Sequence, residues 1–254
     1  MAKIFAITNQ KGGVGKTTTA VNLAASFAAS GHRVLLVDLD PQGNATMGCG
    51  INKRDLEKSV YHLLLGLKTI SEVLKYSENG KFDVLPANRD LAGAEVELVD
   101  QDGRETRLKI ALAEIKQDYD FILIDCPPAL NLLAVNALTA ADAVMIPMQC
   151  EYYALEGVSD LVNTIKKIRA NLNPHLEIEG LLRTMFDPRS MLAQQVSDQL
   201  KSHFDKKVYD TVIPRNIRLA EAPSYGQPAL MYDPNSKGAQ AYLALAEEVL
   251  AKKA

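Results

Sequence analysis

An apolar run, KIFAIT (3–8), leads directly into the glycine-rich loop NQKGGVGKTTT (9–19). A strand, a glycine loop and a helix in this order are typical of a P-loop, whose backbone N–H groups turn inward toward phosphates. Lys16 can reach the β- and γ-phosphates of a nucleotide, and the Thr17 hydroxyl can bind Mg²⁺. The helix that begins here points the positive end of its dipole at the same anions. This segment predicts an α/β fold built around a phosphate site.

The loop departs from the common P-loop pattern at its start. The pattern GxxxxGK[ST] needs a glycine at position 10, where this chain has Gln10. Lys11 follows as a second cation that has no role in an ordinary P-loop. The alternative interpretation is a flexible glycine turn with two solvated lysines. The preceding strand, the following helix and the acidic positions downstream favour the phosphate site.

Apolar runs alternate with amphipathic stretches along the rest of the chain. Several runs are apolar at consecutive positions, which is typical of strands covered on both faces. The stretches 16–30, 155–171 and 236–252 have helical apolar spacing, and Gly31 and Pro174 follow the first two. This alternation predicts a doubly wound, mostly parallel α/β sheet with helices on both faces. The expected strands are 3–8, 33–39, 82–87, 121–125, 143–148, 178–186 and, more weakly, 208–213.

We expect residues 1–254 to form a single P-loop domain, because no repeat, low-complexity tract or linker interrupts them. The least regular stretch, 50–118, is interpreted as a helical insertion around one strand. The net charge of −3 excludes a uniformly basic nucleic-acid binder, and three cysteines without a C-x-x-C exclude a disulfide framework. No apolar run approaches the ~18 residues of a membrane span, and the N-terminus does not fit a signal peptide. These features predict a cytoplasmic protein.

Two further predicted strands end in carboxylates. RVLLVDLD places Asp38 and Asp40 at the end of a strand, where open α/β sheets bind ligands. Asp40 could orient or activate a water for attack on a γ-phosphate, and Asp38 could support the Mg²⁺ shell or the loop lysines. The alternative is an ordinary turn, because Asp-Pro and Gln-Gly-Asn are turn formers. The predicted strand FILID ends in Asp125. A carboxylate at this place is typical of a Walker B residue, which holds Mg²⁺ through water. The neighbouring Cys126 is interpreted as a small residue packed in the core.

The run KGGVGKTT (11–18), with Lys11 ahead of the glycines, resembles the deviant Walker A loop of the SIMIBI class of P-loop ATPases. That class includes MinD, ParA and the nitrogenase iron protein. The resemblance extends from Lys3 to about Ala251 and is closest to the ParA/Soj-type chromosome-partitioning ATPases. Four further segments carry it: LLVDLDPQGNAT (35–46), NALTAAD (136–142), QCEYYALEG (149–157) and IPRNIRLAEAPSYGQP (213–228).

The resemblance implies an ATPase that needs ATP and Mg²⁺ and is slow without a partner. Lys11 would reach the partner's nucleotide in an ATP-sandwich homodimer, and Gly12 would lie at a close dimer contact where a side chain would clash. The resemblance makes Asp40 necessary for hydrolysis and Asp125 the Walker B acid. The catalytic candidates are then Lys11, Lys16, Asp40 and, from its place at the strand end, Asp38. The nucleotide-binding candidates are Lys11, Gly12, Gly13, Val14, Gly15, Lys16, Thr17 and Thr18, with Pro214 and Arg215 beside the adenine, and the Mg²⁺ candidates are Thr17, Asp125 and, again from the strand end, Asp38.

ParA-type proteins bind DNA without sequence preference when they are ATP-bound and dimeric, and a ParB-type partner stimulates hydrolysis. Residues 183–218 hold seven basic and four acidic side chains, a local charge of +3 in a chain of −3. The resemblance singles out Arg189 and Arg218 as DNA contacts and implies association with the nucleoid. The alternative is a solvated charged face. Arg183 departs from the apolar residue expected in some relatives, so its role stays open.

Three other function classes fit the sequence less well. A MinD-like membrane ATPase ends in a basic amphipathic helix, whereas AYLALAEEVLAKKA carries two glutamates and an apolar stripe suited to packing. A redox or metal carrier needs cysteines placed to bridge a dimer, and Cys126 would point into the Mg²⁺ end of the site. A small-molecule kinase leaves Lys11 and the QCEYYALEG segment without a role. We therefore expect no membrane partner.

Overall fold

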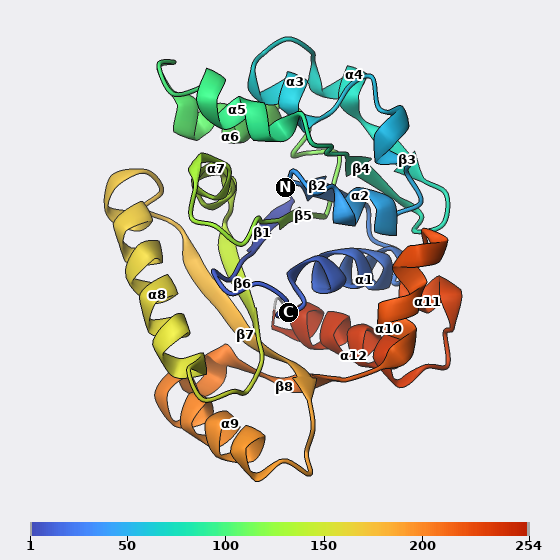
Figure 1. Ribbon diagram of the computed structural model, residues 1–254, viewed down its shortest axis with the longest axis vertical. Coiled ribbons are helices and arrows are strands. Elements are labelled where there is room, and N and C mark those ends of the chain that lie inside the picture. The colour runs from blue at the N-terminus through green and yellow to red at the C-terminus, as the bar shows by residue number, and fades with distance from the viewer. Residues whose placement is uncertain (1, 253–254) are drawn as a thin grey trace.

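Eight strands form one sheet in the order β3-β4-β2-β5-β1-β6-β7-β8, in a computed structural model that describes residues 2–252 (Figure 1). Every neighbouring pair is parallel except β3 and β4, which are antiparallel. The predicted mostly parallel, doubly wound sheet is thereby confirmed. The strands are β1 (Lys3–Ile7), β2 (Val34–Asp38), β3 (Lys75–Ser77), β4 (Phe82–Leu85), β5 (Phe121–Asp125), β6 (Ala143–Met148), β7 (Glu177–Phe186) and β8 (Val208–Pro214).

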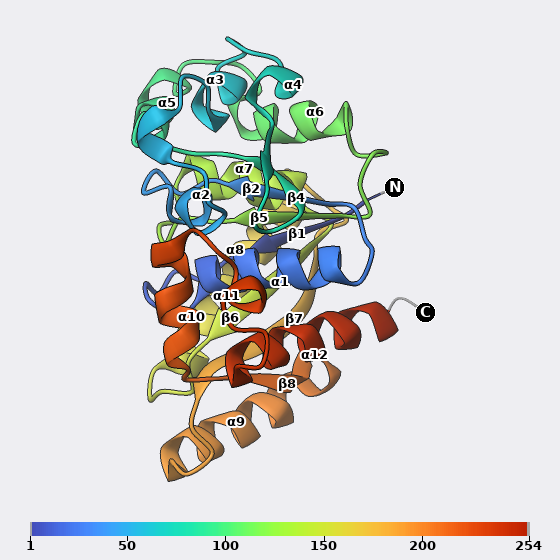
Figure 2. The same ribbon diagram turned by 90° about the vertical axis from the view of Figure 1, so that its right-hand side faces the viewer.

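Helices cover both faces of the sheet (Figures 1 and 2). One core holds residues of α1, α2, α10, α11 and α12, and the other holds residues of α3 to α9. The helices are α1 (Lys16–Ala29), α2 (Asn44–Gly48), α3 (Val60–Leu64), α4 (Ile70–Val73), α5 (Leu91–Glu97), α6 (Arg107–Ala113), α7 (Leu132–Ala140), α8 (Ala154–Asn171), α9 (Met191–Phe204), α10 (Ile217–Glu221), α11 (Ala229–Tyr232) and α12 (Lys237–Ala251).

The central strands are apolar at consecutive positions because they bury both faces. In β1, Phe5 and Ile7 belong to the core beneath α1, whereas Ile4 and Ala6 belong to the core on the opposite face. Side chains of a strand alternate between its two faces, so a strand covered on both sides has no polar face. This arrangement accounts for the unbroken apolar runs in the sequence.

The three long predicted helices form close to their expected bounds as α1, α8 and α12. In α12, the predicted stripe of Tyr242, Leu245 and Val249 is buried in the core shared with α1. The Tyr242 hydroxyl lies 3.0 Å from that of Thr19 on α1, so the two helices also share a buried hydrogen bond. Within residues 2–252, no helix combines the length and apolarity needed to cross a membrane.

The segment 50–118 differs from its prediction in one respect. It contains two strands, because β3 pairs with β4 at the edge of the sheet and runs opposite to it. β3 has three residues, of which Lys75 and Tyr76 are exposed. A short edge strand buries little surface and carries no apolar run, so periodicity gives no signal for it.

The register of the central strands gathers the predicted site at one edge of the sheet. Asp125 at the end of β5 pairs in register with Ile7 at the end of β1 and with Asp38 at the end of β2. The glycine loop follows β1, and α1 begins after it at Lys16. The loop, the two carboxylates and the first turn of α1 therefore meet at the carboxyl ends of the strands.

Candidate nucleotide-binding and hydrolysis site

The glycine loop is held in a fixed shape by its backbone and by two polar anchors. Gly13 and Gly15 have φ of +74° and +87°, a left-handed region that favours glycine. The buried Thr184 hydroxyl on β7 lies 2.7 Å from the Val14 carbonyl. Asn9 donates from Nδ2 to the Pro147 carbonyl and accepts the Lys11 N–H at 3.0 Å. The loop is thereby joined to β6 and β7.

The start of α1 presents free N–H groups to the loop. Gly15 is its N-cap residue, and no side chain caps this end in the described part of the chain. The first turn of a helix has N–H groups without intrahelical partners, and the helix dipole favours an anion beside them. A phosphate bound by the loop can accept these hydrogen bonds.

Lys16 lies inside the loop, and its amine donates to the Lys11 carbonyl at 3.1 Å. Only 7% of the residue is exposed. Burial lowers the pKa of Lys16, and attraction to the Asp125 carboxylate opposes that shift. The ammonium is therefore held where it can meet phosphate oxygens without first losing a full hydration shell.

Asp125 lies buried across from Thr17 with no hydrogen bond to either carboxylate oxygen among residues 2–252. Its pKa is raised well above the usual range, first by burial and then by the neighbouring Asp38, while the nearby Thr17 hydroxyl opposes the shift. Mg²⁺ binds hard oxygen ligands, usually one or two protein groups completed by phosphates and waters. A buried carboxylate without a partner beside a hydroxyl fits that requirement.

Asp38 is fully buried but faces its own loop. Its carboxylate accepts the N–H and the hydroxyl of Thr46 at 2.9 and 2.7 Å, and the N–H of Asp40 at 3.1 Å. Burial raises the pKa of Asp38 to about 6, and the hydrogen bonds from Thr46 limit the shift. Among the described residues, no hydrogen bond or ion pair joins Asp38 to Lys11 or Lys16.

Asp40 lies two residues beyond β2 and is partly exposed. Its Oδ1 accepts the Gln42 N–H at 2.9 Å, and its carbonyl accepts the Gly43 N–H at 2.8 Å, so it opens a tight turn. The turn predicted as an alternative to a functional role is therefore present. The carboxylate also attracts Lys16 and repels Asp125 electrostatically, which places it at the edge of the same site.

Lys11 and Gly12 lie on the outer side of the loop. The Lys11 side chain is 55% exposed and forms an ion pair with Glu151, which precedes α8. Apart from its two chain neighbours, a Cβ placed on Gly12 would have no heavy atom of the described residues within 4 Å. The fold of one chain therefore leaves space for a side chain at position 12.

A cavity of about 180 Å³ lies beside the start of α1. Gly15 and Thr18 form one side of it, and Pro214 and Arg215 at the end of β8 form another. Tyr242 of α12 also lines it. The loop expected to border the adenine thus lies next to the phosphate loop.

The predicted DNA contacts lie at the same edge of the sheet but carry local partners. The Arg189 side chain is 89% exposed, and its guanidinium donates two hydrogen bonds to Asp187, at 3.0 and 2.9 Å. Arg189 and, more weakly, Arg215 lower the pKa of Asp187 to about 2. Arg218 pairs with Glu221 at 2.8 Å and with Asp233 at 3.2 Å. Each arginine would have to exchange a carboxylate for a phosphate to bind DNA.

The positive charge of residues 183–218 is not one patch. Arg183 is buried, where its guanidinium donates to the Ser197 hydroxyl and to the carbonyls of Tyr209 and Asp210, so it joins β7, α9 and β8. Burial lowers its pKa. The charge count predicted a segregated basic region, but sequence proximity does not distinguish a buried arginine from a surface one.

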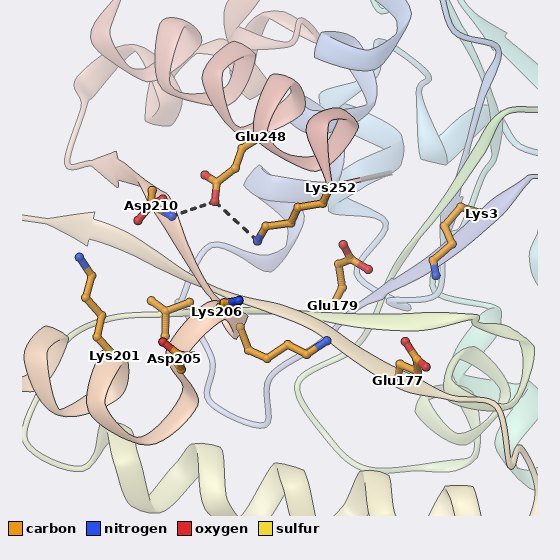
Figure 3. Close-up of a pocket in the computed structure, with 11 residues that line it drawn as sticks. Lys3, Glu177, Glu179, Lys201, Asp205, Lys206, Asp210, Glu248 and Lys252 are labelled. Carbon is orange, nitrogen blue, oxygen red and sulfur yellow. Dashed lines mark hydrogen bonds and ion pairs between the residues drawn. The ribbon is translucent and has the colours of Figure 1, made fainter. Parts of the chain in front are cut away.

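The lysines of the segment lie at the other end of β8. They line a cavity of about 860 Å³ that Figure 3 shows between α9, β7 and α12. Since Lys207 and Arg215 flank the seven residues of β8 and a strand rises ~3.3 Å per residue, the two are separated by roughly 26 Å. Basic and acidic residues are equal in number around this cavity: Lys3, Lys201, Lys206, Lys207 and Lys252 against Glu177, Glu179, Asp205, Asp210 and Glu248.

Several residues that shape the site were missed from the sequence. Asn9, Thr46, Glu151 and Thr184 each contact the loop or an acidic residue of the site. Thr46 and Glu151 stand within segments that carried the family resemblance, but their types alone indicate no role. Thr184 follows Arg183 within the predicted strand 178–186, and two polar residues in a row there are the signal that could have marked it.

Comparison with known proteins identifies the family of this chain. The family model described as an AAA domain matches residues 2–178. The sporulation initiation inhibitor protein Soj of Bacillus subtilis is 58% identical over 251 residues, which is 99% of either chain. The chromosome partitioning protein ParA of Myxococcus xanthus is 53% identical over 250 residues, 98% of this chain and 88% of that one. The chain belongs to the ParA/Soj family of chromosome-partitioning ATPases.

A similar protein of known structure has been solved with a nucleotide and a metal ion. The crystal structure of cobyrinic acid a,c-diamide synthase from Mycobacterium smegmatis, with bound ATP analogue and magnesium, is 39% identical and has a TM-score of 0.86. The match covers 98% of this chain and 95% of that one. As a member of the ParA/Soj family with this site, the chain is an ATPase that uses ATP and Mg²⁺.

Proposed function

We propose that this ParA/Soj-family ATPase is a nucleotide-switched DNA-partitioning protein. ATP drives two copies into a sandwich dimer, and the dimer binds double-stranded DNA without sequence preference. A ParB-type centromere-binding partner then stimulates hydrolysis and releases the dimer. The protein acts in the cytoplasm on the nucleoid. The observation that carries the proposal is the separation of the two loop lysines, one turned into the loop and one turned outward.

Within one chain, the residues divide the work on the nucleotide. Lys16 and the first N–H groups of α1 bind the β- and γ-phosphates, and the cavity at Pro214 and Arg215 accepts the base. Asp40 orients the attacking water at the open side of the site. Preorganised charges of this kind act on a phosphoryl transition state mainly by positioning and electrostatic stabilisation.

Thr17 and Asp125 would hold Mg²⁺, the hydroxyl directly and the carboxylate through water. When bound, Mg²⁺ neutralises charge that develops on the phosphate oxygens. Charge compensation by the ion also supports ionisation of Asp125, which the buried carboxylate otherwise resists.

Lys11 supplies the cation that crosses between subunits. In the single chain its ammonium is exposed and forms an ion pair with Glu151, and this exposed pair is worth at most about 1 kcal/mol. A partner's phosphates carry more charge than one carboxylate and can displace it. Gly12 beside it allows close approach of the second chain.

DNA binding rests on Arg189 and Arg218, with Arg215 between them in sequence and at the same edge of the sheet. Contacts to phosphates without base contacts give sequence-independent binding. A dimer doubles the number of arginines, and each neutralised phosphate adds to affinity and to its salt dependence. Dimerisation therefore strengthens the binding of a site that is weak in one copy.

The proposal is tested by binding to long duplex DNA of random sequence. Binding is measured without nucleotide, with ADP and with ATP–Mg²⁺, each at two salt concentrations. We expect salt-sensitive binding only with ATP–Mg²⁺. Lys16→Ala is the control, because loss of ATP binding should remove DNA binding as well. Equal binding in all three nucleotide states, or none in any, would contradict the switch.

A further inference from the structure

The loop that carries Asp40 is short and is held at both ends by one side chain. It joins β2 to α2 and spans residues 39–43. At its start the Asp40 N–H donates to Asp38 Oδ1 at 3.1 Å. At its far end Thr46 donates to Asp38 Oδ2 from both its N–H and its hydroxyl, at 2.9 and 2.7 Å. Asp38 thus closes the loop into a ring of hydrogen bonds.

The Thr46 hydroxyl also ties this ring to the neighbouring strand. It accepts the Ala87 N–H at 2.9 Å, and Ala87 follows β4, which pairs with β2. Thr46 is fully buried, so both the hydrogen and a lone pair of its hydroxyl have defined partners. Leaving a buried donor or acceptor unpaired is costly, which gives these contacts a strong preference for one geometry.

The last residue of the loop, Gly43, is confined against the same segment. Gly43 has φ of +61°, and a Cβ there would lie 2.6 Å from the Ala87 carbonyl oxygen. The Leu39 N–H donates to the Asp125 carbonyl at 3.0 Å, so the loop is also joined to β5. These contacts fix the backbone on either side of Asp40.

We propose that Thr46 and Asp38 are positioning residues for ATP hydrolysis, which hold Asp40 in place and act through this loop. Asp38 then serves hydrolysis by anchoring residues 40–46, and not by contact with Mg²⁺ or phosphate. The proposal rests on the role of Asp40 under the proposed function. A displacement of about 1 Å at a reacting group can cost ~100-fold in rate, so a loosened loop lowers turnover without weakening nucleotide binding.

The test compares Thr46→Val with Thr46→Ser in the full-length protein. Valine keeps the shape but removes the hydroxyl, and serine keeps the hydroxyl. We expect Thr46→Val to lower kcat about tenfold or more, with unchanged affinity for ATP. Thr46→Ser should stay within about twofold of the parent protein. In the nucleotide-free protein, hydrogen exchange at the amides of residues 40 and 42–46 should be faster in Thr46→Val only.

Asp38→Asn is the second variant, and it tests the positioning role even if Thr46→Val does not fold. We expect lower kcat and faster exchange at 40–46, with the Mg²⁺ concentration for half-maximal turnover unchanged. A raised Mg²⁺ requirement would overturn the proposal by assigning Asp38 to the ion. So would normal turnover in Thr46→Val, or equal loss in Thr46→Ser.

Asp40→Ala, measured alongside, separates this inference from the function it rests on. If Asp40→Ala hydrolyses ATP normally, the proposed role of Asp40 is wrong. If Asp40→Ala is inactive and Thr46→Val is fully active, the role of Asp40 stands and the positioning role of Thr46 is wrong.

Discussion

The Asp125 carboxylate ends β5 with both oxygens buried and without a hydrogen bond among residues 2–252. A group placed this way opposes folding, since its pKa is raised by burial and by Asp38. Sites that bind charged ligands commonly carry such costs, and the ligand relieves them. At the scale of single residues, the nucleotide site is therefore a place where function and stability conflict.

Asp125→Asn should stabilise the nucleotide-free protein. A raised carboxyl pKa means that the folded state holds its proton more tightly than the unfolded state. The cost of ionisation is absent below the unfolded pKa of about 4, grows as pH rises, and is complete above the folded pKa. We expect Asp125→Asn to raise the Tm at pH 8 in EDTA but not at pH 4, by about 2–4 °C for each 1 kcal/mol. Mg²⁺-dependent hydrolysis should be lost.

An equal gain in Tm at both pH values would point to packing and not to charge. Asp100→Asn is a matched control, because Asp100 is exposed and should show no change at either pH.

Asp40→Ala should separate binding from hydrolysis. Asp40 is partly exposed at the edge of the site, and its carboxylate bonds only within its own turn in the described chain. We expect ATP binding within about threefold of the parent protein and ATP hydrolysis reduced at least ~100-fold, since orientation of the attacking water is lost. Nucleotide affinity and single-turnover hydrolysis measure the two. Loss of both in parallel would show that Asp40 acts in binding.

At the scale of elements, the exposed basic residues of segment 183–218 lie at two opposite ends of β8. Arg189 and Arg215 lie just after the ends of β7 and β8. Lys206 and Lys207 lie just before β8, and Lys201 of α9 lines the same cavity, where Figure 3 shows Lys201 and Lys206. The cavity at that end is lined by equal numbers of lysines and carboxylates, so that end has no net positive charge. The arginine end is the one next to the glycine loop, since Arg215 and Gly15 line one cavity.

Arg189→Ala and Arg218→Ala should each weaken ATP-dependent DNA binding. Removing one phosphate-binding cation per subunit lowers affinity and flattens its salt dependence by about one unit of slope for each phosphate that is no longer neutralised. The control is Lys201→Ala with Lys206→Ala, which removes charge at the opposite end and should change affinity less than about twofold. Equal weakening in the arginine and lysine variants would indicate a diffuse charge effect.

Asp187→Asn tests the same surface in the opposite direction. Asp187 is ionised over the whole physiological range, because Arg189 holds its pKa near 2, and it competes with phosphate for that arginine. We expect tighter DNA binding, by several-fold at low salt, from removal of the competing charge. The titration with duplex DNA in ATP–Mg²⁺ measures this change, and unchanged affinity would argue that Arg189 does not contact DNA.

At the scale of the whole molecule, the outer side of the glycine loop is exposed in the single chain. Lys11 is paired with Glu151, and a Cβ on Gly12 beside it would meet no heavy atom of residues 2–252 within 4 Å, apart from its two chain neighbours. In the proposed dimer a second copy would cover this side of the loop. The proposed dimer therefore uses a face that the monomer leaves open.

Gly12→Val should leave the monomer intact and prevent the dimer. Because a side chain meets open space in one chain, we expect an unchanged Tm and retained ATP binding. In the proposed sandwich, valine would clash with the second chain, so ATP–Mg²⁺ should no longer produce a dimer in light scattering. A lower Tm without nucleotide would place the requirement for glycine within the monomer instead.

Local sequence determined much of this protein. The spacing of apolar residues predicted most strands and the long helices, and the glycines before Lys16-Thr17 predicted the P-loop. Both patterns can be seen in the sequence because these elements form between residues that are close together in the chain. The same patterns selected Asp38, Asp40 and Asp125, since carboxyl ends of parallel strands meet at one edge. The edge strand β3 was not predicted, because three residues are too few to show an alternation of apolar and polar positions.

Only the tertiary structure decided how these residues are used. Asp38 and Asp125 have the same type and lie in register, yet one accepts three hydrogen bonds from its loop and the other accepts none among residues 2–252. Arg183 and Arg189 are six positions apart, but one is buried among carbonyls and the other is exposed. Partners distant in sequence set these differences, because burial and hydrogen bonding depend on packing between elements, which the order of residues alone does not fix.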